Sequence, residues 1–258
     1  MCHVLVNITR ATGADPNARN RKGHTILHMA AASDHQPNVQ RQLVQLLLQY
    51  KASASIWDKQ GNAALHFAAA GSTTDVLQLL LSASSEVSTP NYAGQTPLEL
   101  AAKHGRVGHC KGLLARGARE DKRDLGVLFA AAGAGQTRVV RLLLEDGAVP
   151  SEFAVAAAAA NDHPSVAKLL LERGVVLREF ALAAAAAKNH TTVLSLLLAA
   201  LPEASISAAA RIAVPAAAYA GHMAALELLL LPHAGYDAVK QEEFRAAATH
   251  ARCYIHGT

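Results

Sequence analysis

The chain has 258 residues and a formal net charge of +4 at pH 7, and 51% of its residues are hydrophobic while only 4% are aromatic. Such small aliphatic side chains favour closely stacked helices over a broad β core. No apolar run approaches the about 18 residues that cross a bilayer, and the first residues do not form a secretory signal. We therefore expect no membrane span and a cytoplasmic or nuclear location.

A leucine triplet recurs along the whole chain. The first leucines of the first two triplets, Leu46 and Leu79, are 33 residues apart, and Gly112 takes the same position 33 residues later. The next intervals are 30, 27, 27 and 32 residues, at Leu142, Leu169, Leu196 and Leu228. A regular period of this length predicts a helical repeat protein. Half repeats are expected at both ends, so the chain is expected either to be a fragment of a longer array or to cover its N-terminal edge with a partner.

Each unit is predicted to hold two helices joined by a tight turn. An alanine-rich segment is followed by a turn residue and then by apolar residues at helical spacing. The turn residues tolerate a left-handed backbone: Gly105, Gly135, Asp162, Asn189 and Gly221. The second helix ends at a glycine in several units, whereas Lys51, Ser84, Leu201 and His233 take this place in others.

Three segments resemble the ankyrin repeat family. "KGHTILHMAA", "GNAALHFAAA" and "GQTPLELAAKHG" are similar to its G-x-TPLH-x-AA pattern, and "TGADPNARN" resembles the finger that precedes it. The resemblance is strong for residues 11–117 and weaker beyond 126. It implies an all-α solenoid with short β-hairpin fingers that binds other proteins. It also implies that His28 and His66 are buried and link neighbouring repeats by hydrogen bonds, and Glu99 replaces this histidine in the third unit.

The second half departs from the family pattern. In "GAVPSEFAVAAAAANDH" and "GVVLREFALAAAAAKNH" the residues of the finger are missing, so residues 126–258 should be shortened helix pairs that end in a capping half repeat. Residues 1–125 should carry the fingers, within one continuous array. Glu-Phe pairs precede alanine-rich segments at residues 152, 179 and 243, which places each carboxylate near a helix N-terminus.

No pattern in the sequence indicates catalysis, a cofactor or a metal. Common nucleotide, zinc-protease and esterase signatures are absent. The three cysteines are too far apart for a metal site, and we expect them to be reduced. His24 and His28 have ligand-like spacing, but His24 precedes the helix, so the two need not share a face. His163, His190 and His222 occupy equivalent turns and should stabilise them.

The charge is uneven between the two halves. Residues 1–125 hold 14 Lys and Arg against 9 Asp and Glu, whereas residues 126–258 hold 10 against 11. The basic segment 103–123 lacks interleaved aromatic residues, which argues against nucleic acid. We therefore expect a protein partner with an acidic surface, bound by a chain that is itself monomeric or part of a longer array.

The fingers are the expected binding surface. Arg19, Trp57 and Pro90 precede the Asp or Asn of each finger, and Trp57 is the expected hot spot because a large exposed ring is costly to leave in water. The predicted partner-binding residues are Arg19, Lys22, His24, Trp57, Lys59, Asn62, Pro90, Tyr92 and Gln95. The alternative is a small-molecule-binding protein or an unusual enzyme, with a pocket near Tyr219 and His222.

Overall fold

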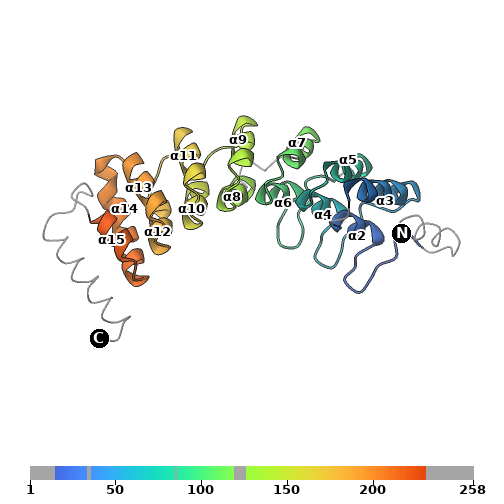
Figure 1. Cartoon of the computed structure of the whole chain (residues 1–258), viewed down its shortest axis with the longest axis horizontal. Helices are drawn as coiled ribbons and strands as arrows, with labels where there is room; N and C mark the ends of the chain where they lie inside the picture. Colours follow the sequence, from blue (N-terminus) through green and yellow to red (C-terminus); the bar gives the residue numbers. More distant parts are fainter. Residues whose placement is uncertain (1–14, 34–35, 85, 119–125, 231–258) are drawn as a thin grey trace. The chain divides into compact units, whose positions relative to one another are not determined.

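A computed structural model describes residues 15–33, 36–84, 86–118 and 126–230. The chain divides into two compact units, unit 1 (residues 1–121) and unit 2 (residues 122–258). The predicted half repeats at both ends, the third Glu-Phe pair and His233 lie outside the described residues. All regular elements in the described part are α-helices, as predicted (Figure 1).

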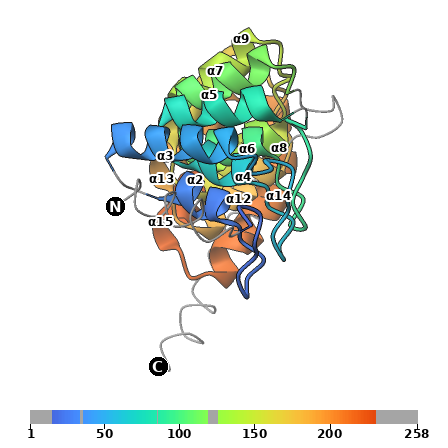
Figure 2. The same ribbon diagram turned by 90° about the vertical axis from the view of Figure 1, so that its right-hand side faces the viewer.

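The described residues of unit 1 form three helix pairs in two rows. The inner row packs α2 on α4 and α4 on α6, while α3, α5 and α7 form the outer row (Figures 1 and 2). Their bounds are α2 Ile26–Ala32, α3 Pro37–Gln49, α4 Ala64–Ala70, α5 Thr74–Ala83, α6 Pro97–Lys103 and α7 Val107–Ala115. The leucine positions explain the packing, because Leu47, Leu80 and Leu113 are buried in equivalent seams between the rows.

Each helix pair of unit 1 is preceded by a finger. In all three fingers an Asn or Asp closes a tight loop with the residue four positions later, through hydrogen bonds of 2.9 Å from the N–H of Asn20, Asp58 and Asn91. Gly23, Gly61 and Gly94 have φ near +80° at the same place in these loops. The hydrogen-bonded hairpins are too short for a β-strand to form in the described residues.

The turns between the helices follow the sequence pattern closely. All five predicted turn residues have positive φ, including the non-glycine residues Asp162 at 57° and Asn189 at 58°. Lys51 also adopts the left-handed cap, with φ of 62°. Ser84 and Leu201 do not, because their helices end in extended backbone with φ of −117° and −84°. A non-glycine residue in the left-handed conformation costs conformational free energy. Of these three residues, only Lys51 has this cost.

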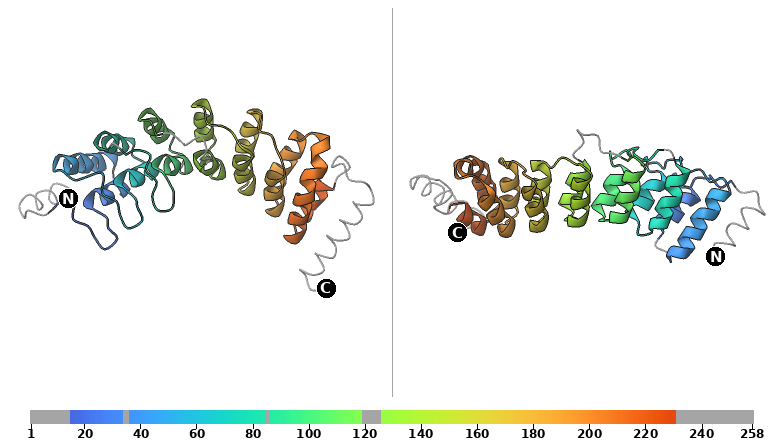
Figure 3. Two further views of the ribbon diagram at one scale, coloured as in Figure 1. Left: turned by 180° about the vertical axis from the view of Figure 1, so that it is seen from behind. Right: turned by 90° about the horizontal axis from the view of Figure 1, so that it is seen from above.

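Over residues 126–230, unit 2 stacks four helix pairs side by side (Figure 3). The inner helices are α8 Gly126–Gly133, α10 Glu152–Ala160, α12 Phe180–Ala187 and α14 Glu203–Tyr219, and the outer helices are α9 Thr137–Glu145, α11 Pro164–Glu172, α13 Thr191–Ala200 and α15 Met223–Leu229. The links between pairs are short and carry no finger, as predicted. Buried alanines such as Ala158 and Ala185 let these inner helices pack closely.

The histidine row stabilises turns in unit 2. His163 packs on the backbone of the preceding turn, where a Cβ on Gly135 would lie 2.7 Å from its ring. His190 reaches back to the preceding repeat, with Nε2 3.2 Å from the Ala160 carbonyl. Both rings are half-buried, so the row is less exposed than a plain surface turn.

In unit 1 the Cys110 thiol is buried, and burial raises its pKa to about 12.

Candidate functional site

The fingers of unit 1 are joined to one another by hydrogen bonds to backbone carbonyls. The guanidinium of Arg19 donates a hydrogen bond of 2.8 Å to the Trp57 carbonyl. The Lys59 N–H donates to the Lys22 carbonyl at 3.1 Å, and the Tyr92 N–H donates to the Gln60 carbonyl at 2.9 Å. Because each finger holds the next, the three finger tips form one pre-organised surface rather than three independent loops.

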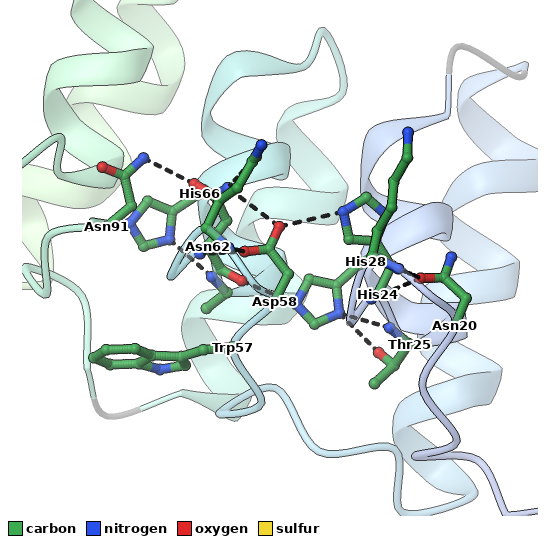
Figure 4. Close-up of polar contacts among 12 residues, drawn as sticks. Asn20, His24, Thr25, His28, Trp57, Asp58, Asn62, His66 and Asn91 are labelled. Carbon is green, nitrogen blue, oxygen red and sulfur yellow. Dashed lines mark hydrogen bonds and ion pairs between the residues drawn. The ribbon is translucent and has the colours of Figure 1, made fainter. Parts of the chain in front are cut away.

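Asp58 is the centre of a polar network between the first two fingers (Figure 4). Its buried carboxylate accepts hydrogen bonds of 2.8 Å from the backbone N–H groups of Gln60 and Asn62. Its Oδ2 also lies 3.2 Å from Nε2 of His24. Burial acts to raise the pKa of Asp58, but the hydrogen bonds from Asn62 and Gln60 outweigh it and hold the pKa below its usual value.

His28 links the first repeat to the second, as the family resemblance implied. Its Nδ1 accepts a hydrogen bond from the Thr25 N–H at 3.1 Å, so Nε2 carries the proton and donates to the Asn62 carbonyl at 3.0 Å. The His24 ring stacks on it with centroids 5.9 Å apart, so the two rings lie closer together than the sequence suggested. Both Nε2 atoms are thus engaged within the protein.

His66 occupies the same position one repeat later but lacks the second hydrogen bond. Its Nδ1 accepts from the Ala63 N–H at 3.1 Å. Nε2 is buried and makes no hydrogen bond of regular geometry. Burial lowers the pKa of His66, and the backbone groups of Thr89 and Gln95 only partly oppose this shift. Therefore the neutral imidazole at this position supports the finger without closing the link seen at His28.

A cleft of about 640 Å³ lies between the second and third fingers and the inner helices α4 and α6. Phe67, Ala70 and Leu100 supply its apolar lining. Four of the predicted binding residues line its polar side: Lys59, Asn62, Tyr92 and Gln95. An apolar floor with a few polar groups at the rim is the usual composition of a recognition site.

The remaining predicted residues lie around this cleft or are used by the fold. Arg19 and His24 border a second hollow, of about 330 Å³, with Met29 and Tyr50. Lys22 and Pro90 are exposed on the first and third fingers. Of the four cleft residues, Asn62 is largely structural, because its side chain donates to Asp58 at 3.2 Å and accepts from the Asn91 amide at 2.8 Å.

The most exposed finger aromatic is Tyr92 rather than Trp57. Tyr92 is 72% exposed, whereas Trp57 is half-buried and its ring lies apart from the histidine network (Figure 4). Gly61 makes room for Tyr92, since a Cβ there would lie 2.7 Å from its ring. Sequence position predicted that Trp57 faces solvent, whereas the structure leaves it half-buried. Sequence position also missed Asp58, whose partner His24 belongs to another repeat.

The described residues offer neither a metal centre nor a membrane span. Nowhere among them do three His, Cys, Asp or Glu side chains gather closely enough to hold a metal ion. None of the described helices has both the length and the apolar character that crossing a membrane requires. Tyr219, proposed above to border a pocket, is 93% exposed, and His222 is half-buried at the start of α15.

Paired helices in two rows, with fingers ahead of the inner helices, define a helical solenoid of the ankyrin type. The family model for ankyrin repeats (3 copies) matches residues 1–91 and 38–124. The crystal structure of the human ASB11 ankyrin repeat domain superposes with a TM-score of 0.69 at 20% identity, over 83% of this chain and all of that one. Residues 1–124 thus belong to the ankyrin repeat family.

Curated relatives share the repeats but are much longer proteins. The chain is 30% identical over 170 residues to a transient receptor potential cation channel subfamily A member 1 homolog of Caenorhabditis elegans, covering 62% of this chain and 14% of that protein. It is 32% identical over 146 residues to the mouse nuclear factor NF-kappa-B p105 subunit, covering 54% and 14%. A probable E3 ubiquitin-protein ligase of rice, XBOS33, is 39% identical over 89 residues, covering 33% and 17%.

Proposed function

We propose that the chain is a non-enzymatic module that recognises another protein through the fingers and inner helices of unit 1. The observation that carries this proposal is the cleft between the second and third fingers, which gathers four predicted binding residues beside an apolar floor. Tyr92 supplies a large exposed ring at its edge, and aromatic residues of this kind are enriched among interface hot spots. Ankyrin repeats generally bind proteins, which agrees with this role.

Charge favours a partner with an acidic surface. The finger residues Arg19, Lys22 and Lys59 are exposed, whereas the acid between them, Asp58, is buried and already hydrogen-bonded. Residues 1–125 carry 14 Lys and Arg against 9 Asp and Glu. A positive rim accelerates association with an acidic partner and excludes basic ones. The module would act as a scaffold in the cytoplasm or nucleus.

A photo-crosslinking experiment tests the position of the site. A benzophenone amino acid replaces Tyr92 in one sample and Gln45, exposed on the outer helix α3, in a control sample. Both proteins are irradiated in an extract of the source cells. We expect a protein adduct at Tyr92 and none at Gln45. Equal adducts at both positions would reject the finger surface as the site.

Titration of the recovered partner then tests the chemistry. Tyr92→Ala should weaken binding at least about tenfold, because truncating an interface hot spot costs about 2 kcal/mol or more. Lys59→Glu should slow association and reduce its salt dependence. The matched control is Lys111→Glu on the outer helix α7, which should change neither. Similar losses for Lys59→Glu and Lys111→Glu would indicate only a general effect of net charge.

A further inference from the structure

Unit 2 carries an exposed apolar row at the position where its fingers are missing. Phe153 opens the inner helix α10 and is 52% exposed, and Phe180 opens α12 and is 55% exposed. Their rings stack with centroids 6.0 Å apart. Ile212 has the same sequence register but lies within α14 rather than at its start, and it is 41% exposed. Each of the three residues precedes the first leucine of its triplet by the same interval, so the row repeats with the fold.

The short links between repeats extend this row. Val149 is 68% exposed and Val176 is 77% exposed, at equivalent places ahead of Phe153 and Phe180. The sequence continues the register beyond the described residues, where Phe244 follows Ile212 at the interval that separates Ile212 from Phe180. We call Val149, Phe153, Val176, Phe180 and Ile212 the apolar row. Contiguous exposed apolar side chains of this kind mark interaction sites.

The apolar row is held in place by hydrogen bonds rather than left as a mobile surface. The Glu152 carboxylate accepts hydrogen bonds from the backbone N–H groups of Arg178, at 2.8 Å, and Phe180, at 3.2 Å. It therefore fixes the link that carries Val176 and orients the start of α12. A surface ordered before binding loses less entropy when a partner docks.

The charges beside the apolar row indicate which partner fits it. Arg178 is exposed two residues before Phe180, and Arg211 is exposed directly before Ile212. Glu152 is committed to the backbone, so the exposed charges nearest in sequence to Phe180 and Ile212 are basic, whereas the exposed acids Glu145, Asp146 and Glu172 precede Val149 and Val176. The ring centroids of Phe153 and Phe180 are 6.0 Å apart. This distance is about the rise along a helix axis from residue i to residue i+4.

We propose that the apolar row binds an amphipathic helix of another protein, with acidic residues along one flank of its apolar stripe. Helices of this kind dock through side chains spaced i, i+3, i+4 and i+7. This surface lies in unit 2 and is separate from the finger cleft of unit 1, so the two proposals stand or fall independently.

The same charges argue against other occupants. A twofold dimer through this row would set the patch that carries Arg178 and Arg211 against a second copy of itself, which is unfavourable for like charges. Anionic membranes attract clusters of several basic residues. In unit 2 the exposed acids Glu145 and Glu172 stand at the ends of outer helices, just ahead of Val149 and Val176. Residues 126–258 as a whole hold 10 basic against 11 acidic side chains.

Two designed peptides test the proposal on the full chain. Both are fluorescein-labelled amphipathic helices with the same leucine stripe, and the flank carries Glu in one and Lys in the other. We expect the Glu peptide to bind at least about tenfold more tightly than the Lys peptide, measured by fluorescence anisotropy. Equal binding of the two peptides would overturn the charge argument.

Variants then locate the peptide on the surface. Phe153→Ser combined with Phe180→Ser should weaken the Glu peptide at least about tenfold, and Arg178→Glu with Arg211→Glu should abolish its advantage over the Lys peptide. The control Met29→Ser changes an exposed apolar residue of unit 1 and should have no effect. Circular dichroism melting curves verify that each variant is folded. Unchanged binding by the folded phenylalanine variant would overturn the proposal.

Three further results would assign the apolar row to another occupant and reject the proposal. The first is a dimer in analytical ultracentrifugation that the phenylalanine variant dissociates. The second is co-sedimentation with anionic vesicles that depends on Phe153 and Phe180. The third is an intramolecular crosslink from a benzophenone at position 153 to residues 231–258 of the purified chain.

Discussion

His24 and Asp58 join the first finger to the second through a contact of 3.2 Å between Nε2 and Oδ2. The His24 ring is half-buried, whereas the Asp58 side chain is fully buried. The carboxylate also accepts two backbone hydrogen bonds, so it serves both the shape of its own finger and the spacing to the neighbouring one. The finger surface of unit 1 therefore depends on a residue that itself never reaches solvent.

Asp58→Ala should destabilise unit 1 by about 2–3 kcal/mol, because it leaves the part-buried N–H groups of Gln60 and Asn62 without their acceptor. Urea denaturation measures the loss. His24→Ala should cost less, since it removes one partner of the carboxylate and leaves its backbone hydrogen bonds in place. A larger loss for His24→Ala than for Asp58→Ala would show that the His24 contact, rather than the backbone hydrogen bonds, determines stability.

Stability should fall as the pH drops below about 6.5. Burial lowers the pKa values of His28, His66 and His109 from 6.5 in the folded chain. Between that value and the lower native values the unfolded chain binds more protons, so the free energy of unfolding decreases as pH falls through this window. Urea midpoints at pH 8 and pH 5.5 measure the effect. His109→Gln should reduce the difference between the midpoints, and an unchanged difference would exclude His109 as a contributor.

Gly61→Ala should disturb the finger surface more than Gly94→Ala. Both residues have φ near +78°, so each alanine costs about 1 kcal/mol from the backbone. At Gly61 the new Cβ would also lie 2.7 Å from the Tyr92 ring and 2.9 Å from its backbone nitrogen, whereas at Gly94 it meets nothing within 4 Å. Thermal unfolding and partner titration of both variants provide the comparison. Equal effects would mean that Tyr92 moves aside without cost.

Leu170→Ala should cost about 2–5 kcal/mol, because a fully buried leucine would leave a cavity in the seam of unit 2. His163→Ala should cost clearly less, since its half-buried ring covers a turn rather than filling the core. Chemical denaturation of the two variants tests this order. Losses of equal size would show that the histidine contacts across the turn contribute as much as the leucine seam.

Trp57→Ala separates binding from packing at the second finger. If Trp57 contacts the partner, affinity should fall by at least about 2 kcal/mol, roughly thirtyfold, with little change in the melting temperature. The Arg19 hydrogen bond to the carbonyl of residue 57 survives this change, because it involves only the backbone. Calorimetric titration and melting curves measure both quantities. A lower melting temperature with unchanged affinity would make Trp57 a packing residue.

The sequence by itself determined the repeat, the helix pairs, the left-handed turns and the loss of fingers in the second half. These features depend on residues close together in the chain. Leucines at helical spacing and alanines that allow close packing specify the helices within a few residues. Gly, Asn or Asp specifies the left-handed turn between two helices, as at Asp162. For the same reason, the equivalent positions of His28 and His66 could be recognised before their hydrogen bonds were known.

Only the tertiary structure decided which side chains meet across repeats. The contact of His24 with Asp58 and the stack of Phe153 on Phe180 each join neighbouring repeats. Spacing along the chain brings such residues to the same level, but their rotamers and the exact separation of the repeats decide whether they touch. His28 and His66 illustrate the difference, because equivalent positions give a completed hydrogen bond at one and an unpartnered Nε2 at the other.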